Sequence, residues 1–241
     1  MTVRGELQIV PAGHGLRRCL TLLLYLVLAH PAGAQWPAAL PASDTGEISR
    51  GRVVMIQRDV EGTPWPRVRL HRFIDATPEQ SIAMLADYAH RRTYLADLKE
   101  VRIERQLDSG RIEVFFRYAS NVPLVPDVSY TLVDRLHRDR DGSYSIGWTL
   151  RSGKRVKRID GNARFSRWTN PATGRVGTLL TYDNYVVPDF RFASVGVVRH
   201  KAIAAMGVAV EAIAVEVERE RAHDGPLLER QVAALRLALA R

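Results

Sequence analysis

The pattern of hydrophobic and polar positions predicts strands through most of the chain after residue 50. Apolar side chains recur at every second position in several short runs, which is the period of a strand with one dry and one wet face. The expected strands are 52–60, 67–74, 101–106, 112–118, 128–132, 144–150, 159–165 and 176–187. Antiparallel sheets of this kind place the dry face against a single covering layer. We therefore expect an α+β domain with one sheet covered on one side.

Two short helices are predicted between the second and third strands. Thr77 can cap the first helix, Pro78 suits its first turn, and Gln80 completes a capping box with Thr77. The stretch 88–101 is typical of a second short helix that leads into a strand.

A long helix is predicted after the last strand, over about residues 192–222. Its large apolar side chains form one stripe at three- and four-residue spacing: Ile203, Met206, Val210, Ile213 and Val217. Between residues 202 and 215 the only charged residue is Glu211, whereas an ordinary surface helix has one polar face. We expect a curved sheet to enclose this helix.

The C-terminal tail, residues 223–241, predicts a separate amphipathic helix. Leu228, Val232, Leu235 and Leu239 share one face of it. That face either packs onto the domain or contacts a membrane or a partner protein.

The N-terminal residues 1–34 have the pattern of a secretory signal peptide. Arg17 and Arg18 precede an apolar core of about eleven residues, and the small residues 32–34 suit cleavage. A membrane anchor is the alternative, but a bilayer span needs about 20 apolar residues. We expect export to the periplasm with cleavage, followed by a linker over 35–50, a domain over 51–222 and the tail helix.

Cleavage would change the cysteine count and the charge. Cys19 is the chain's one cysteine, so the exported protein would have no disulfide and no thiolate nucleophile. Loss of three Arg and one Glu lowers the formal charge from +9 to +7. A basic protein favours anionic surfaces. Because nucleic acid is scarce outside the cytoplasm, we expect an anionic membrane surface rather than nucleic acid as a partner, with the oligomeric state left open.

Motifs for enzymatic chemistry are missing from the sequence. It has no nucleophile elbow, no phosphate-binding glycine loop and no histidine pair with metal-ligand spacing. We therefore name no catalytic residue, no metal site and no cofactor.

The order of elements resembles the START-like or SRPBCC superfamily, also called the helix-grip fold. The resemblance is carried by IDATPEQSIAMLADYAHRRTYLADLKEVRIERQ, IEVFFRYASNVPLVPDVSYTLVDRL and GTLLTYDNYVVPDF with the long helix behind it. It implies a sheet of about seven antiparallel strands wrapped on a C-terminal helix, with an elongated hydrophobic cavity between them. Members bind lipids, sterols, polyketides or plant hormones. Many lipid-binding members carry a charged pair in the strand after the proline-bearing loop, and we do not place such a pair in DVSYTLVD.

Inward positions of the expected strands and helix are the candidate lining of that cavity, although plain core packing uses the same residue types. They are Phe116, Tyr118, Tyr130, Trp148, Phe165, Leu180, Tyr182, Asn184, Met206 and Val210. Tyrosines and Asn184 would supply the few polar groups that pockets contain.

Two loops and one turn complete the candidate site. The loops at the expected cavity mouth contain Pro123, Leu124, Val125, Pro188, Phe190 and Phe192. They suit a gate that opens on a membrane, or turns stiffened by proline. A basic patch for docking on anionic lipid is expected at Arg151, Lys154, Arg155, Lys157 and Arg158. The alternative for these cations is a solvated hairpin.

These features lead to one main hypothesis and two alternatives. The main hypothesis is a periplasmic START-like protein that binds a hydrophobic ligand, a lipid by preference, and carries or presents it between membranes. An enzyme that resembles a polyketide cyclase or aromatase would need buried acid or base groups in the same cavity. An envelope-assembly factor would have a solid core and act through the tail helix.

Overall fold

The computed structural model describes residues 40–108, 110–120, 126–189, 194–223 and 225–240. The chain divides into two units, residues 1–40 and 41–241, and every described strand and helix belongs to the second unit. The expected signal peptide, the loop residues Pro123, Leu124 and Val125, and the aromatic residues Phe190 and Phe192 lie outside the described residues.

Eight strands and five helices are described in this unit. The strands are β1 (Val54–Arg58), β2 (Arg67–Ile74), β3 (Leu98–Asp108), β4 (Arg111–Tyr118), β5 (Val128–Arg138), β6 (Tyr144–Lys154), β7 (Val156–Thr169) and β8 (Val176–Pro188). The helices are α2 (Ala42–Ser49), α3 (Pro78–Ala86), α4 (Arg91–Tyr94), α5 (Val195–Ala222) and α6 (Pro226–Leu239).

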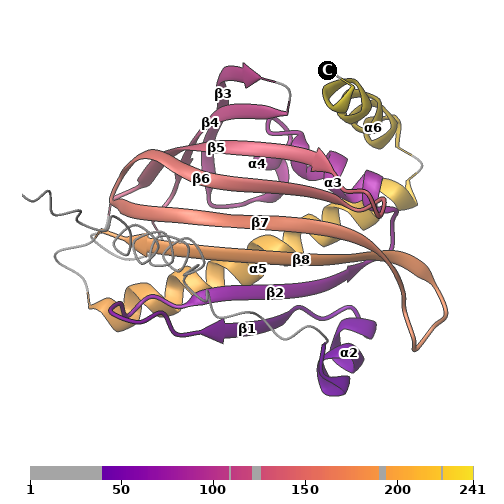
Figure 1. Cartoon of the computed structure of the whole chain (residues 1–241), viewed down its shortest axis with the longest axis horizontal. Helices are drawn as coiled ribbons and strands as arrows, with labels where there is room; N and C mark the ends of the chain where they lie inside the picture. The colour runs from indigo at the N-terminus through magenta and orange to yellow at the C-terminus, as the bar shows by residue number, and fades with distance from the viewer. Residues whose placement is uncertain (1–39, 109, 121–125, 190–193, 224, 241) are drawn as a thin grey trace, which may run out of the picture. The chain divides into compact units, whose positions relative to one another are not determined.

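The strands form one antiparallel sheet in the order β1-β2-β8-β7-β6-β5-β4-β3 (Figure 1). All eight expected strands are confirmed, one more than the family resemblance implied. β2 and β8 are neighbours because the chain leaves the sheet after β2, forms α3 and α4, and returns at the opposite edge with β3. This route places the two short helices over one face of the sheet.

Local signals account for α3. Gln80 N–H donates to Thr77 Oγ1 at 3.2 Å, and Thr77 N–H donates to Gln80 Oε1 at 3.0 Å. This is the expected capping box, and it satisfies two backbone donors that the first turn leaves free. Ile82 and Met84 are fully buried, so α3 is fixed against the sheet by its apolar face.

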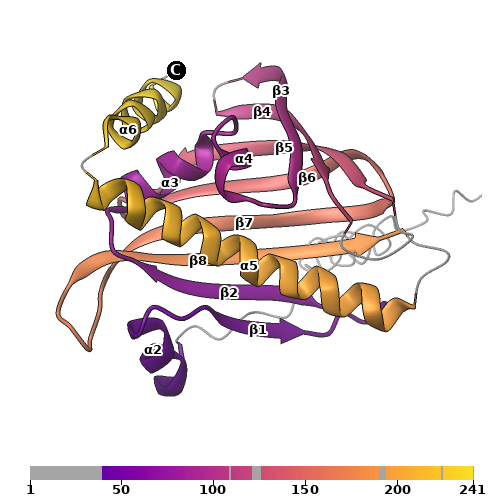
Figure 2. The same ribbon diagram turned by 180° about the vertical axis from the view of Figure 1, so that it is seen from behind.

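The long helix α5 lies diagonally across the same face, beside α3 and α4 (Figure 2). Val210, Ile213 and Val217 are at most 3% exposed, and burial of each contributes roughly 1.5–3 kcal/mol. The one charge in its apolar run is compensated, because Arg72 of β2 donates to Glu211 at 3.0 Å. The α+β helix-grip architecture and the extra C-terminal amphipathic helix are therefore confirmed.

The expectation that the sheet encloses α5 on most sides is wrong for its outer face. Val197, Val208 and Val215 are 52%, 67% and 49% exposed. The sheet curves behind the helix but does not close around it. The apolar residues of the sequence therefore mark two different surfaces of α5, a covered one and an uncovered one.

The stretch 35–50, for which the composition predicts a linker, contains the helix α2. Pro41 is its N-cap residue, and Ile48 is its one buried side chain. Asn170, which follows β7, donates to the Ser49 carbonyl at 2.9 Å. A helix with a single buried residue gives no apolar periodicity, so the pattern could not indicate it.

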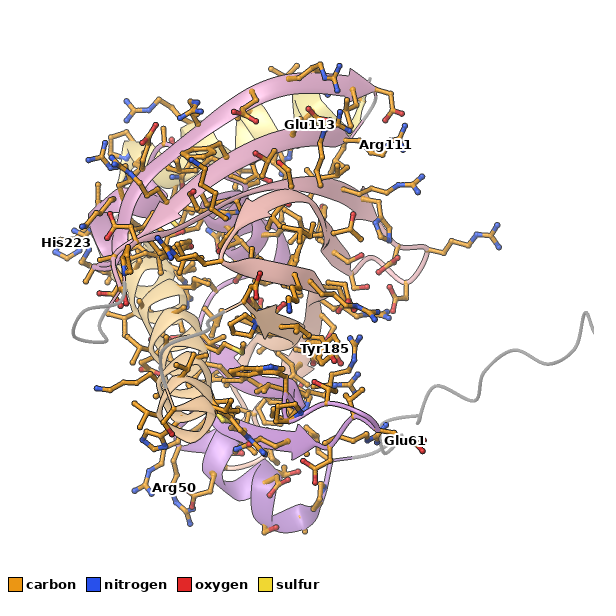
Figure 3. All side chains as sticks on the ribbon, turned by 90° about the vertical axis from the view of Figure 1, so that its left-hand side faces the viewer. Arg50, Glu61, Arg111, Glu113, Tyr185 and His223 are labelled. Carbon is orange, nitrogen blue, oxygen red and sulfur yellow. The ribbon has the colours of Figure 1, made fainter. Side chains whose placement is uncertain are left out.

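The outer, convex face of the sheet carries charges that are paired along its strands. Arg67 of β2 binds Asp160 of β7 at 2.6 Å and Asp183 of β8 at 2.9 Å. Tyr185 lies on this side of the sheet, away from α5 (Figure 3), under the guanidinium groups of Arg67 and Arg158. Much of the basic composition is thus used to tie neighbouring strands together.

His71 of β2 makes the stability of the fold depend on pH. Its side chain is 6% exposed and pairs with Thr181 Oγ1 at 3.1 Å. Burial lowers the pKa of His71 from 6.5 to about 4; Arg69 also lowers it, whereas Asp44 and Asp183 raise it. The unfolded chain therefore takes up a proton between these two pH values that the folded chain does not.

We expect the free energy of unfolding to fall by about 1–3 kcal/mol through His71 as the pH drops from about 6.5 to about 4. The measurement is urea unfolding of the protein and of His71→Gln at pH 7 and pH 4.5. Carboxylates titrate in the same range, so the difference between the two proteins is the relevant quantity. An equal loss of stability in His71→Gln would contradict the assignment.

Candidate functional site

The ten expected lining residues all lie on the concave face of the sheet or on α5, and they fall into two groups. Six are at most 8% exposed and belong to the packed core: Phe116, Trp148, Phe165, Leu180, Asn184 and Val210. Four are only partly covered by the protein: Tyr118, Tyr130, Tyr182 and Met206. Plain core packing therefore accounts for the first group but leaves the second unexplained.

The tyrosines of the second group belong to two sets of aromatic contacts, one on β4 and β5 and one on β6 and β8. The rings of Tyr118 and Tyr130 stack at a centroid distance of 6.0 Å and an interplanar angle of 18°. Phe116 lies 5.7 Å from Tyr130, and Tyr182 lies 5.1 Å from Trp148. The inward rings of β4 and β5 and those of β6 and β8 thus form two groups on the concave face, which together are called the aromatic surface.

Hydrogen bonds fix part of this surface. Trp148 Nε1 donates to Asn184 Oδ1 at 3.0 Å, and Asn184 Nδ2 donates to the Tyr182 hydroxyl at 3.4 Å. Asn184 is thereby a structural link between β6 and β8. Its hydrogen bonds explain why a polar side chain is tolerated at a buried position.

The protein environment shifts the pKa values of the three tyrosines. Burial raises the pKa of Tyr118, Tyr130 and Tyr182 above the ordinary value of 10, and the mutual proximity of the hydroxyls raises those of Tyr130 and Tyr182 further. These side chains are nevertheless partly uncovered. Each of these three side chains is thus partly exposed, although burial is the largest cause of its raised pKa.

A buried polar cluster adjoins the aromatic surface, and sequence reasoning did not find it. Tyr88 donates from its hydroxyl to Asp134 Oδ2 at 2.7 Å, and Asp134 is 3% exposed. Burial raises the pKa of Asp134, against the effects of Arg91 and of the Tyr88 hydrogen bond. Arg91 is 8% exposed and lies 4.1 Å over the Tyr88 ring. A carboxyl group, a phenol and a permanently charged guanidinium therefore converge inside the fold.

The signal for Asp134 was present in the alternation of β5. Tyr130 and Leu132 point inward, and the same period leads to Asp134, the last residue of the stretch DVSYTLVD. Arg91 had no such signal, because its neighbourhood resembles a solvated helix end. In the structure its guanidinium instead donates to the Leu85 carbonyl at 2.8 and 2.5 Å.

The basic patch lies at the turn between β6 and β7, and most of it is paired. Arg151 binds Glu113 at 2.9 Å, Lys157 binds Asp189 at 3.2 Å, and Arg158 binds Asp160 at 2.5 Å. Lys154 and Arg155 are exposed and have no ion pair with any described residue. Pro188 ends β8 opposite Val156, so the end of β8 lies at this same turn.

A polar groove of about 1200 Å³ lies at the other end of α5 and is not suited to an apolar molecule. Its charges are used within the protein: Asp75 binds both Arg175 and Arg221, and Glu79 binds Arg236. In the part of the chain that is described, no cluster of three or more metal-ligating side chains is found. Among the described helices, none is long and apolar enough to span a bilayer.

Known proteins resemble this chain in structure rather than in sequence. No family model matches the sequence, and no curated protein matches it. The STAR-related lipid transfer protein from Xanthomonas axonopodis is similar in structure, with a TM-score of 0.58 and 15% identity over 68% of this chain and 93% of that chain. Human StAR-related lipid transfer protein 5 has a TM-score of 0.59 and 12% identity, covering 85% of this chain and 97% of its own. The lipid transfer and protein localization domain of human StarD13 has a TM-score of 0.55 at the same identity and coverage.

Proposed function

We propose that this chain, which has the START-like fold, binds a hydrophobic ligand between the concave face of its sheet and α5. The observation that carries the proposal is the state of Tyr118, Tyr130 and Tyr182, which are partly uncovered although burial raises the pKa of each. Side chains with both properties support an internal space between the sheet and α5. A lined internal space with few polar groups is the usual form of a small-molecule site.

We further propose that the ligand is a lipid and that the protein carries it between membranes in the periplasm. The three proteins of similar structure described above are all named for lipid transfer. The apolar core and small-residue cleavage site at the N-terminus support export. The excess of positive charge supports contact with anionic lipid.

Mass spectrometry of organic extracts tests ligand binding directly. The protein is purified without detergent from cells that export it, and the extract is compared with that of an equally treated soluble protein. We expect one lipid class at close to one molecule per chain. The proposal would be refuted if the purified protein contained no lipid and took up none from phosphatidylglycerol vesicles.

An enzymatic role is a second candidate, and the cluster of Tyr88, Arg91 and Asp134 favours it. Such a role requires an acid or base close to the ligand, and Asp134, whose pKa is raised by burial, lies in the cluster that adjoins the aromatic surface. The same extracts separate the two functions. A carrier returns its ligand unchanged after long incubation, whereas an enzyme converts it.

The turn between β6 and β7 is expected to dock on anionic membranes through Lys154. Since one cation near such a surface contributes about 1 kcal/mol, Lys154→Glu should slow lipid transfer between phosphatidylglycerol vesicles about fivefold or more. Arg140→Glu is the matched control, because Arg140 is equally exposed but lies in the turn between β5 and β6 at the opposite end of the sheet. The readout is transfer of a fluorescent phospholipid. Equal slowing by both variants would mean that the change in net charge, and not docking through this turn, explains the effect.

A further inference from the structure

A second pocket, of about 660 Å³, lies between α6, α3 and the three strands nearest one edge of the sheet, β3, β4 and β5. Small-molecule sites typically have about 300–1,000 Å³. Most of its wall is apolar, and it shares no residue with the ten expected lining residues. Its apolar lining includes Ala83, Ala86, Val101, Ile112, Leu136 and Leu235.

The helix α6 closes this pocket on one side. Leu228 and Leu235 are at most 4% exposed, and Arg236 binds Glu79 at the start of α3 through two hydrogen bonds of 2.8 and 2.6 Å. Figure 1 shows α6 beside α3 and apart from β3. Ile103 of β3 lines the pocket and is 56% exposed. The mouth of the pocket therefore lies between β3 and α6.

Two buried acceptor oxygens on side chains that line this pocket have no hydrogen-bond donor among the described residues. They are Asp134 Oδ1 and Gln231 Oε1, on side chains that are 3% and 5% exposed. The other polar atoms of these side chains are used: Asp134 Oδ2 accepts from Tyr88, and Gln231 Nε2 donates to Asp87 at 2.9 Å. An unsatisfied buried acceptor costs folding free energy, so a donor supplied by a ligand would stabilise the complex.

The charges around the pocket select among possible donors. Two cations, Arg102 and Arg230, and two acidic residues, Asp87 and Asp134, line it. The wall therefore offers neither an ammonium group nor a carboxylate an unbalanced counter-charge. A carboxylate lacks a donor and would lie near the acceptor oxygens of Asp134 and Gln231. A neutral hydroxyl carries no charge and supplies a hydrogen-bond donor, so it suits this pocket.

We propose that the pocket beneath α6 is a second binding site, for a neutral aliphatic molecule whose hydroxyl donates to Asp134 Oδ1 or Gln231 Oε1. The site is separate from the space between the sheet and α5. Tyr88 stands between the two, because it lines the pocket while its ring lies 6.4 Å from Phe116 of the aromatic surface.

Calorimetric titration with three probes of equal chain length tests the chemistry. Octan-1-ol should bind the full chain at least tenfold more tightly than octanoate or octylammonium. Equal binding of the charged probes would refute recognition of a hydroxyl. A protein that binds none of them, with only water between α6 and β3 in a crystal soaked with octan-1-ol, would overturn the site.

Two tryptophan variants of α6 test the location. Ala234 lines the pocket, whereas its neighbour Ala233 is also exposed but does not line it. Ala234→Trp should weaken octan-1-ol binding at least tenfold, and Ala233→Trp should leave it unchanged. Equal effects of the two variants would place the alcohol elsewhere. Met206→Trp narrows the space next to α5 and should leave octan-1-ol binding unchanged. The result for this pocket is therefore independent of the result for the proposed function.

Discussion

Gly161→Ala is expected to lower the free energy of unfolding by about 2–4 kcal/mol. Gly161 lies in β7 between Trp148 of β6 and Asn184 of β8. A Cβ atom at this position would stand 2.8 Å from the Trp148 indole and closer still to the carbonyl oxygen of Asp183. The indole rests on the bare backbone of Gly161, so any side chain must displace it.

Gly147→Ala is the matched control for this effect. Gly147 lies in the neighbouring strand β6, and a Cβ there would meet only the Gly161 carbonyl, at 3.7 Å. We expect a change within about 0.5 kcal/mol, as for most substitutions without a steric conflict. Urea unfolding followed by circular dichroism measures both variants. Equal losses would show that glycine itself, rather than the space above it, matters in these strands.

Met206→Trp is expected to reduce bound ligand at least tenfold while the fold is retained. Met206 is a partly covered side chain on the stripe of α5 that faces the sheet. A larger ring at this point takes up space that the ligand would fill, and loss of about 1.4 kcal/mol of binding free energy already corresponds to tenfold weaker binding. The measurement is bound lipid per chain in organic extracts.

Val208→Trp is the control on the same helix. Val208 is 67% exposed on the outer face of α5, so a tryptophan there leaves the inner space unchanged. Retention of ligand by Val208→Trp and its loss from Met206→Trp would locate the ligand on the sheet side of α5. Full retention by both variants would mean that the space next to Met206 is not used.

Local sequence patterns predicted the elements of this fold because each pattern has a local physical cause. The alternation of inward and outward side chains located the strands, and the Thr77–Gln80 pair located the start of α3. The stripe from Ile203 to Val217 located the covered face of α5. None of these predictions required knowledge of which strands are neighbours.

Features that depend on distant parts of the chain were not predictable in this way. Arg91 is buried because Tyr88 and Phe116 lie around it, and Phe116 belongs to β4, a strand that the chain forms only later. The pocket under α6 needs β3, α3 and α6 together. Apolar content alone also could not tell the covered face of α5 from the exposed face that carries Val208. For the candidate site, the sequence pointed to the inward tyrosines and Asn184 but not to the buried cluster of Tyr88, Arg91 and Asp134.

The ion pair between Arg236 and Glu79 joins residues 157 positions apart, whereas the last strand of the sheet ends at Pro188. During synthesis the sheet can assemble before α6 has left the ribosome, and α6 docks as a separate, final event. The same order holds in reverse, since α6 can detach from α3 while every strand keeps its partners. Backbone amides of α6 should therefore exchange with deuterium sooner than those of β7 and β8.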